Sequence, residues 1–108
     1  MKIKTRQRYE ARAKIAKALA HPSRLMILDA LQQQELCVCE LTELVGADQS
    51  TVSKHLAILK NTGLVEDRKE GSMSVYHNTC QCLDGFFGCM ESVLKANFKI
   101  QAKLVASL

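Results

Sequence analysis

The sequence lacks the features of several large protein classes. No apolar run approaches the roughly 18 residues that a membrane-spanning helix requires, and the basic N-terminus lacks the apolar core of a signal peptide. There is no nucleotide-binding loop, no paired-carboxylate pocket and no Cys-x-x-Cys redox motif, so an enzyme is the least expected class. Repeats, low-complexity tracts and linkers are also missing. We therefore expect a cytoplasmic protein that has no membrane partner.

Length and charge favour one small domain with a polyanionic partner. The 108 residues, 47% of them hydrophobic, predict a single domain over residues 1–108. Its core is modest, and dimerisation would bury more surface. The net charge of +4 suits nucleic acid but is weak support alone. Basic residues crowd the first quarter against Glu10 alone, either to touch phosphates or as a solvated helix face: Lys2, Lys4, Arg6, Arg8, Arg12, Lys14, Lys17 and Arg24.

Apolar spacing and helix-terminating residues predict four helices in the first part of the chain. After a loose arm at residues 1–4, residues 5–20 form the first, and Pro22 opens the second because proline fits a first helical turn. Residues 35–38 are expected to be extended or irregular. The third helix covers residues 39–45 and ends at Gly46, and the fourth covers residues 49–61 with Asp48 or Ser50 as its N-cap. The last two, joined by a tight turn, are typical of a helix-turn-helix.

A hairpin and a long helix complete the predicted fold. Residues 64–69 and 73–77 form two strands around a turn at residues 70–72, and residues 82–106 form the last helix. The apolar content of that helix exceeds what a small monomer needs, which indicates a dimer interface. We thus predict a mainly α winged helix-turn-helix with the order α-α-α-α-β-β-α. It is a homodimer held by the terminal helices at residues 5–20 and 82–106.

The fourth helix has the side chains of a DNA recognition helix. Such a helix needs short hydrogen-bonding groups toward the major groove and an apolar underside. Gln49 and Ser50 at its tip are predicted to contact bases, and Thr51, Ser53, Lys54 and His55 to contact phosphates or bases. In the wing, Arg68, Lys69 and Ser72 are predicted to reach the backbone or an adjacent minor groove.

Together these segments resemble the ArsR/SmtB family of metalloregulatory repressors. The resemblance rests on residues 35–41 (ELCVCEL), residues 50–56 (STVSKHL), the glycine-turned wing and the opening of the second helix at residues 21–28, and it covers about residues 10–80. It implies a homodimeric repressor that binds a palindromic double-stranded DNA operator and leaves it when an inducer binds. Two-fold symmetry then places the recognition helices about 34 Å apart in successive major grooves.

Cys37 and Cys39 are the first candidate inducer ligands. Thiolates suit arsenic(III), antimony(III), cadmium, lead, zinc or copper(I). On a regular helix the two thiols would point about 200° apart, so they share an ion only if the helix begins after Cys37 or unwinds. A helix N-terminus is also expected to lower their pKa. The alternative is that both thiols pack as small hydrophobic groups.

The remaining ligands are less defined. Family members with a three-thiol arsenic site carry a third cysteine where this chain has Thr42, so the third ligand is expected from Cys80, Cys82 or Cys89. Cys80 and Cys82 repeat the Cys-x-Cys spacing of a second chelating pair, whereas Cys89 is expected in the core. The family's zinc site of His and Asp on the last helix is not predicted, because no histidine follows Cys82. His21 is expected to cap or pack.

Arsenite is the preferred inducer, and two alternatives stay open. In the first alternative, the thiols form a redox or reactive-sulfur switch that closes a disulfide such as Cys37–Cys82. Otherwise, Cys37, Cys39, Cys80 and Cys82 hold a structural zinc in a constitutive DNA-binding module.

Overall fold

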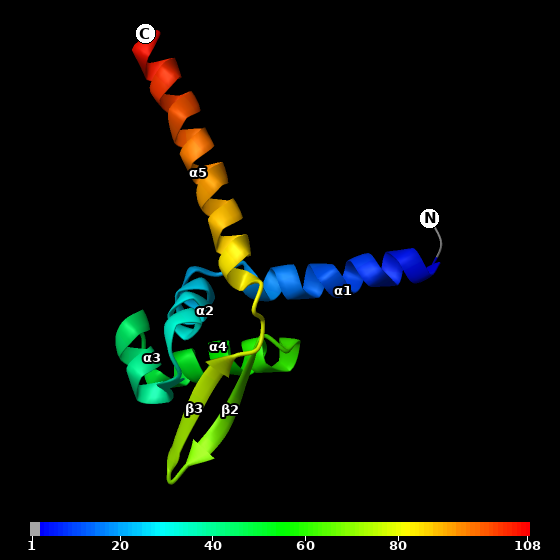
Figure 1. Ribbon diagram of the computed structural model, residues 1–108, viewed down its shortest axis with the longest axis vertical. Helices are drawn as coiled ribbons and strands as arrows, with labels where there is room; N and C mark the ends of the chain where they lie inside the picture. Colours follow the sequence, from blue (N-terminus) through cyan, green and yellow to red (C-terminus); the bar gives the residue numbers. More distant parts are fainter. Residues whose placement is uncertain (1–2) are drawn as a thin grey trace.

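The computed structural model describes the backbone of residues 3–108 and the side chains from Thr5 onward (Figure 1). Its elements are α1 (Ile3–Leu19), α2 (Pro22–Gln33), β1 (Leu36–Cys37), α3 (Val38–Val45), α4 (Gln49–Thr62), β2 (Val65–Glu70), β3 (Met73–Asn78) and α5 (Leu83–Ala106). The predicted winged helix-turn-helix is confirmed. Of the predicted loose arm, residues 3 and 4 are helical, while residues 1 and 2, with the Lys2 and Lys4 side chains, lie outside the described residues.

The core forms where α2, α3 and α4 meet, and it holds the recognition helix in place. Val52, Leu56 and Leu59 of α4 are fully buried at helical spacing, against Leu41 of α3 and Ile27 of α2. Since each such side chain contributes roughly 1.5–3 kcal/mol by leaving water, this apolar underside fixes which face of α4 looks outward.

Helix termini set the sharp angle between α3 and α4. Gly46 ends α3 with φ of 75°, a left-handed conformation that a side chain disfavours. The Asp48 side chain then accepts a hydrogen bond of 2.8 Å from the backbone N–H of Thr51. Asp48, one of the two predicted candidates, is therefore the N-cap of α4.

The sheet has three strands, one more than predicted. Its order is β1-β3-β2, antiparallel throughout, with Leu36 opposite Tyr76 and Cys37 opposite Val75. The free edge of β3 would otherwise leave backbone groups unpaired, and the extended residues before α3 fill it. The predicted order α-α-α-α-β-β-α is thus corrected by a short strand between the second and third helices.

Both terminal helices extend away from the body (Figure 1). The radius of gyration is 17.3 Å, whereas a compact chain of this length has about 13 Å. Several large apolar side chains on α5 are exposed in the described chain, including Phe98 at 72%. Across residues 3–108, no helix combines the length and the apolar character needed to cross a membrane.

Candidate DNA-binding surface and thiol sites

The outer face of α4 presents five of the predicted DNA contacts together. Gln49, Ser50, Thr51, Ser53 and Lys54 are all exposed on its first two turns, because the apolar positions between them face the core. The Ser50 hydroxyl donates a hydrogen bond of 3.1 Å to the Asp48 carboxylate. The tip of the helix is thus pre-ordered, and its polar groups are accessible to a duplex.

His55 differs from the prediction, because it faces inward. Its side chain is 9% exposed, and its Nδ1 accepts a hydrogen bond of 3.2 Å from Nε of Arg24. The His21 ring lies 4.4 Å away between centroids. Burial, followed by the nearby His21 and Arg24, lowers the pKa of His55. His55 therefore ties α4 to the start of α2, and its assignment to DNA contact is corrected.

Neighbouring residues explain this inward position. His21 is the N-cap of α2, where its Nδ1 accepts a hydrogen bond of 3.1 Å from the Ser23 N–H, as the capping prediction required. Arg24 also donates to the Ala18 carbonyl at 3.3 Å. The Arg24 and His55 partnership was missed by the sequence analysis, since 31 residues separate them and no local pattern links them.

The basic residues of the wing carry internal partners. Arg68 of β2 binds Glu35 through two hydrogen bonds of 2.7 and 2.8 Å, and binds Glu70 at 2.9 Å. These hydrogen bonds raise the pKa of Arg68 and lower that of Glu35. Lys69 donates to the Ser74 hydroxyl at 2.8 Å. To contact DNA, Arg68 must therefore replace its hydrogen bonds to Glu35 and Glu70 with hydrogen bonds to phosphates. Ser72 is exposed in the turn.

A salt bridge joins the wing to the recognition helix. Lys60 near the end of α4 lies 2.7 Å from the Asp67 carboxylate in β2. The Lys60 hydrogen bond lowers the pKa of Asp67, so the carboxylate is ionised at neutral pH. The bridge therefore connects strand β2 of the wing directly to the last turn of α4.

Cys37 and Cys39 stand on either side of the boundary between β1 and α3. Cys37 is the extended N-cap of α3 (φ −82°, ψ 167°), and its N–H donates to the Glu40 carboxylate at 3.1 Å. Because the helix begins after Cys37, the geometric condition for a shared ion is met. Cys37 is buried and Cys39 is exposed, so only the Cys39 thiol is open to solvent.

The pKa of Cys37 is raised, contrary to expectation. The Glu40 backbone N–H lowers the pKa, but the Glu40 carboxylate, burial and a hydrogen bond with the Cys39 thiol outweigh this. The neighbouring carboxylate and thiol destabilise the Cys37 thiolate more than the helix N-terminus stabilises it. The Cys37 thiol is therefore a weaker acid than an ordinary cysteine.

Cys80 and Cys82 form a second thiol pair at the junction of β3 and α5. Their sulfurs lie 3.1 Å apart, with Cys80 half-buried and Cys82 exposed as the N-cap of α5. Cys89 is exposed on α5 in this chain, where a core position was expected. Within the described part of the chain, no three His, Cys, Asp or Glu side chains gather to hold a metal ion. Within one chain the thiols thus form two pairs, Cys37 with Cys39 and Cys80 with Cys82, and neither pair has a third ligand beside it.

Comparisons with known proteins agree with this geometry. Residues 21–67 match the model of the bacterial regulatory protein, arsR family. An arsenical resistance operon repressor from Staphylococcus xylosus is 41% identical over 76 residues, covering 70% of this chain and 73% of that protein. One from Staphylococcus aureus is 34% identical over 99 residues, covering 92% and 95%. A homodimeric winged helix-turn-helix DNA-binding domain from Mycobacterium bovis superposes with a TM-score of 0.77 at 30% identity, covering 92% of each chain. The chain belongs to the arsR family of bacterial regulatory proteins and is a winged helix-turn-helix transcriptional regulator.

Proposed function

We propose that the protein is a repressor that binds a palindromic operator as a homodimer and releases it when arsenite binds Cys37 and Cys39. The observation that carries this proposal is the start of α3 at Val38, which leaves Cys37 extended beside the Cys39 thiol. Because Cys37 lies outside the helix, its thiol is not held about 200° away from that of Cys39 as it would be on a regular helix, and the two thiols are hydrogen-bonded. The arsenical resistance repressors that match the chain supply the choice of arsenite.

The chemistry of the pair suits a neutral trivalent metalloid. Each sulfur replaces one hydroxyl group of arsenous acid, and the thiol proton leaves with that hydroxyl as water. Because the thiol protons leave as water, two thiols that are protonated at rest bind the metalloid with no net change in charge, which is compatible with the raised pKa of Cys37. Antimony(III) reacts alike, whereas cadmium, lead and zinc must displace the protons. In the described chain none of Cys80, Cys82 and Cys89 joins this pair, so the proposal needs Cys37 and Cys39 alone.

Release follows from what β1 touches. Closing a ring through both sulfurs moves Cys37, and the β1–β3 pairing and the Glu35–Arg68 bond carry that motion to the wing. The Lys60–Asp67 bridge links the wing to α4. Coupling of about 1–3 kcal/mol is typical of allosteric proteins and weakens operator binding by roughly 5–150-fold.

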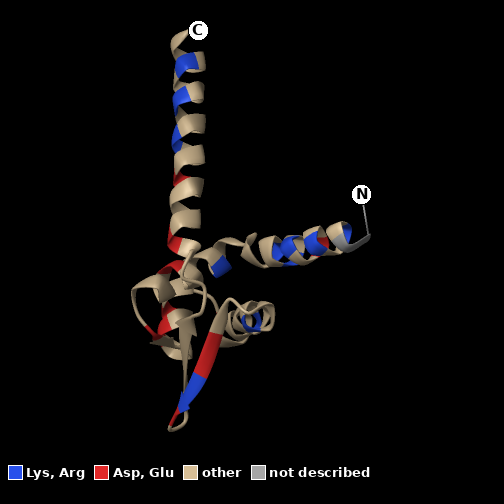
Figure 2. Ribbon diagram, turned by 45° about the vertical axis from the view of Figure 1, so that its right-hand side comes forward, with Lys and Arg blue, Asp and Glu red and all other residues tan. Residues whose placement is uncertain are grey.

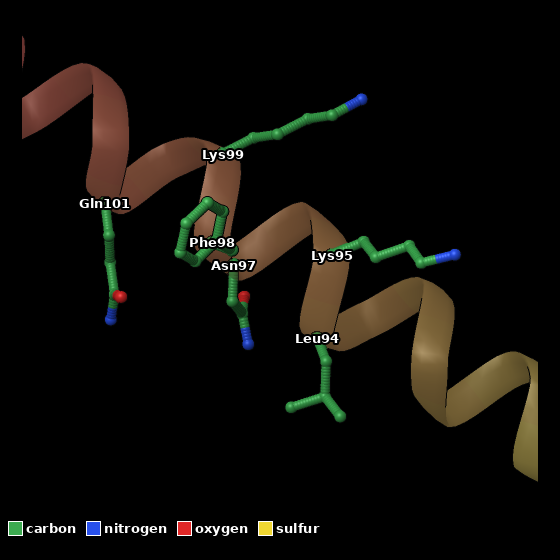
Figure 3. A pocket seen from close by; sticks show the side chains of 6 residues that line it. All are labelled: Leu94, Lys95, Asn97, Phe98, Lys99 and Gln101. Atoms are coloured by element: carbon green, nitrogen blue, oxygen red, sulfur yellow. The ribbon is translucent and has the colours of Figure 1, made fainter.

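Charge and exposed apolar surface support the homodimer. A groove between α2 and α5 has apolar walls and three carboxylates, from Asp29, Asp84 and Glu91, while α1 carries a row of basic residues (Figure 2). The α1 helix of a second copy complements this groove. On α5, Lys95 and Lys99 point to one side, while Leu94, Asn97 and Gln101 point to another (Figure 3). The exposed apolar side chains Leu94, Phe98 and Val105, which recur at helical spacing along α5, pack against the same helix of that copy.

The experiment starts by selecting an operator from a random duplex pool with the reduced protein. Fluorescence anisotropy then gives its affinity with and without arsenite, antimonite, cadmium, lead and zinc. We expect a palindromic site whose affinity falls roughly 5–150-fold with arsenite. A protein with no sequence preference, or an operator complex indifferent to every ion, would refute the proposal.

A further inference from the structure

The loop between the wing and the last helix carries a second pair of neighbouring thiols, Cys80 and Cys82. The Cys80 and Cys82 sulfurs lie 3.1 Å apart, so closing the 2.05 Å bond of a disulfide requires a shift of only about 1 Å. The geometry points to a reversible dithiol–disulfide couple at Cys80 and Cys82, which takes its oxidising equivalents from a small-molecule disulfide and acts independently of Cys37 and Cys39.

The loop holds the two sulfurs in this position through its backbone. The Asn78 side chain donates to the Cys80 carbonyl and accepts from the Cys80 N–H, both at 2.9 Å. The Leu83 N–H then bonds to the Cys80 carbonyl at 3.5 Å as α5 begins. Cys80 is thus fixed on one side by the end of β3, and Cys82 on the other by the first turn of α5. The pair is pre-organised by the fold.

Exposure assigns different roles to the two sulfurs. Cys82 is exposed and meets the oxidant first, whereas Cys80 is half-buried against the core. The Cys82 thiolate attacks a disulfide sulfur of oxidised glutathione and expels one glutathione thiolate. The Cys80 thiolate then attacks the Cys82 sulfur and expels the second. The two protein sulfurs lose two electrons, glutathione disulfide gains them, and the two thiol protons pass to the departing thiolates.

The resulting ring spans one intervening residue, Gln81, which makes it strained and reducible. Exposed or strained disulfides have higher reduction potentials and act as labile, regulatory bonds. Because Cys80 lies two residues after β3 and Cys82 is the N-cap of α5, the bond restricts the angle at which the wing meets α5. Formation of the Cys80–Cys82 disulfide therefore acts on the wing at the junction of β3 and α5, without involving β1 or α3.

The test treats the reduced full-length protein with oxidised glutathione, blocks free thiols with iodoacetamide and measures intact and peptide masses. We expect two of the five thiols to escape alkylation, with the loss of two hydrogens on the peptide that contains Cys80 and Cys82. The Cys37→Ser, Cys39→Ser double variant should behave in the same way. Excess reduced glutathione should restore both thiols.

A single variant distinguishes the couple from ordinary surface thiols. In Cys80→Ser the mixed disulfide of Cys82 with glutathione should persist, because no second thiol resolves it. The inference is overturned if the wild-type protein also stops at that mixed disulfide, if it forms a covalent dimer through Cys82, or if both thiols stay alkylatable. None of these measurements involves DNA or arsenite, so the outcome is independent of the proposed function.

Discussion

Cys37 and Arg68 pair with the same residue of the central strand from opposite sides. Cys37 is opposite Val75 in the β1–β3 ladder, and Arg68 is opposite Val75 in the β2–β3 ladder. Side chains paired in this way point to one face of a sheet, so the thiol and the guanidinium share that face. Arg68 also binds Glu35, two residues before Cys37. Cys37 is therefore connected to the wing through one row of residues, which is the route along which the proposed inducer would act.

Glu35→Gln should weaken the response to the inducer more than it weakens the operator complex. The substitution removes the charge that holds Arg68 to β1 and leaves the β1–β3 pairing in place. We expect the ratio of operator affinities without and with arsenite to fall about two- to fivefold, the range of one exposed ion pair. The matched control is Glu70→Gln, which keeps the Glu35–Arg68 bond and should keep the ratio. Equal effects of both variants would exclude the specific link to β1.

His55→Ala should destabilise the fold by about 1–3 kcal/mol, because Arg24 loses a buried partner. The measurement is urea unfolding of the dimer at fixed concentration. The pKa of His55 is lowered below 6.5 on folding, so the unfolded chain binds more protons there. Stability is then full above about pH 6.5 and falls as the pH drops toward the folded-state pKa. His55→Gln should remove this slope, and a slope that persists in it would contradict the assignment.

Lys54→Ala should weaken binding to all duplexes alike, whereas Gln49→Ala should weaken the selected operator more than other sequences. Both side chains are exposed on the first turns of α4. Lys54 is positively charged and is expected to bind phosphates, whereas Gln49 is expected to contact bases. Titration at several salt concentrations should show the slope of log affinity against log salt reduced by about 2 for Lys54→Ala, because the dimer loses one phosphate contact from each protomer. Lys99→Ala on α5 is the charge-matched control and should keep the wild-type slope. A normal slope in Lys54→Ala would remove it from the interface.

Phe98→Glu should convert the dimer into a monomer. The ring is 72% exposed in one chain, and a carboxylate in its place would be buried unpaired between two copies, at a cost that a small interface does not offset. Analytical ultracentrifugation measures the shift, and operator affinity should fall with it. Lys95→Glu, which changes the charge on a different side of α5 (Figure 3), should remain dimeric. A dimeric Phe98→Glu variant would place the interface elsewhere.

Local signals were sufficient to predict α4 to within one residue. Val52, Leu56 and Leu59 recur at helical spacing, and the predicted residues 49–61 became Gln49–Thr62, with Asp48, one of two candidates, as the N-cap. The wing was predicted for the same reason, since Gly71 lies between two short alternating segments.

Contacts between distant residues could not be predicted in this way. Strand β1 is two residues long and exists because β3, almost 40 residues later, offers it a free edge. His55 stands beside Leu56 in a polar stretch, and only the arrival of Arg24 and His21 makes its burial favourable. The direction of the Cys37 pKa shift depends on how close Glu40 and Cys39 come. These features depend on tertiary packing, which a propensity or a spacing does not encode.

The central claim is that the sulfurs of Cys37 and Cys39 receive the inducer. The most direct measurement is operator affinity with and without arsenite, in a reducing buffer, for Cys37→Ser, Cys39→Ser beside the matched pair Cys80→Ser, Cys82→Ser. We predict that the first variant binds the operator and keeps it at every arsenite concentration, while the second still releases it. Release by arsenite that survives in the first variant and disappears in the second would contradict the account.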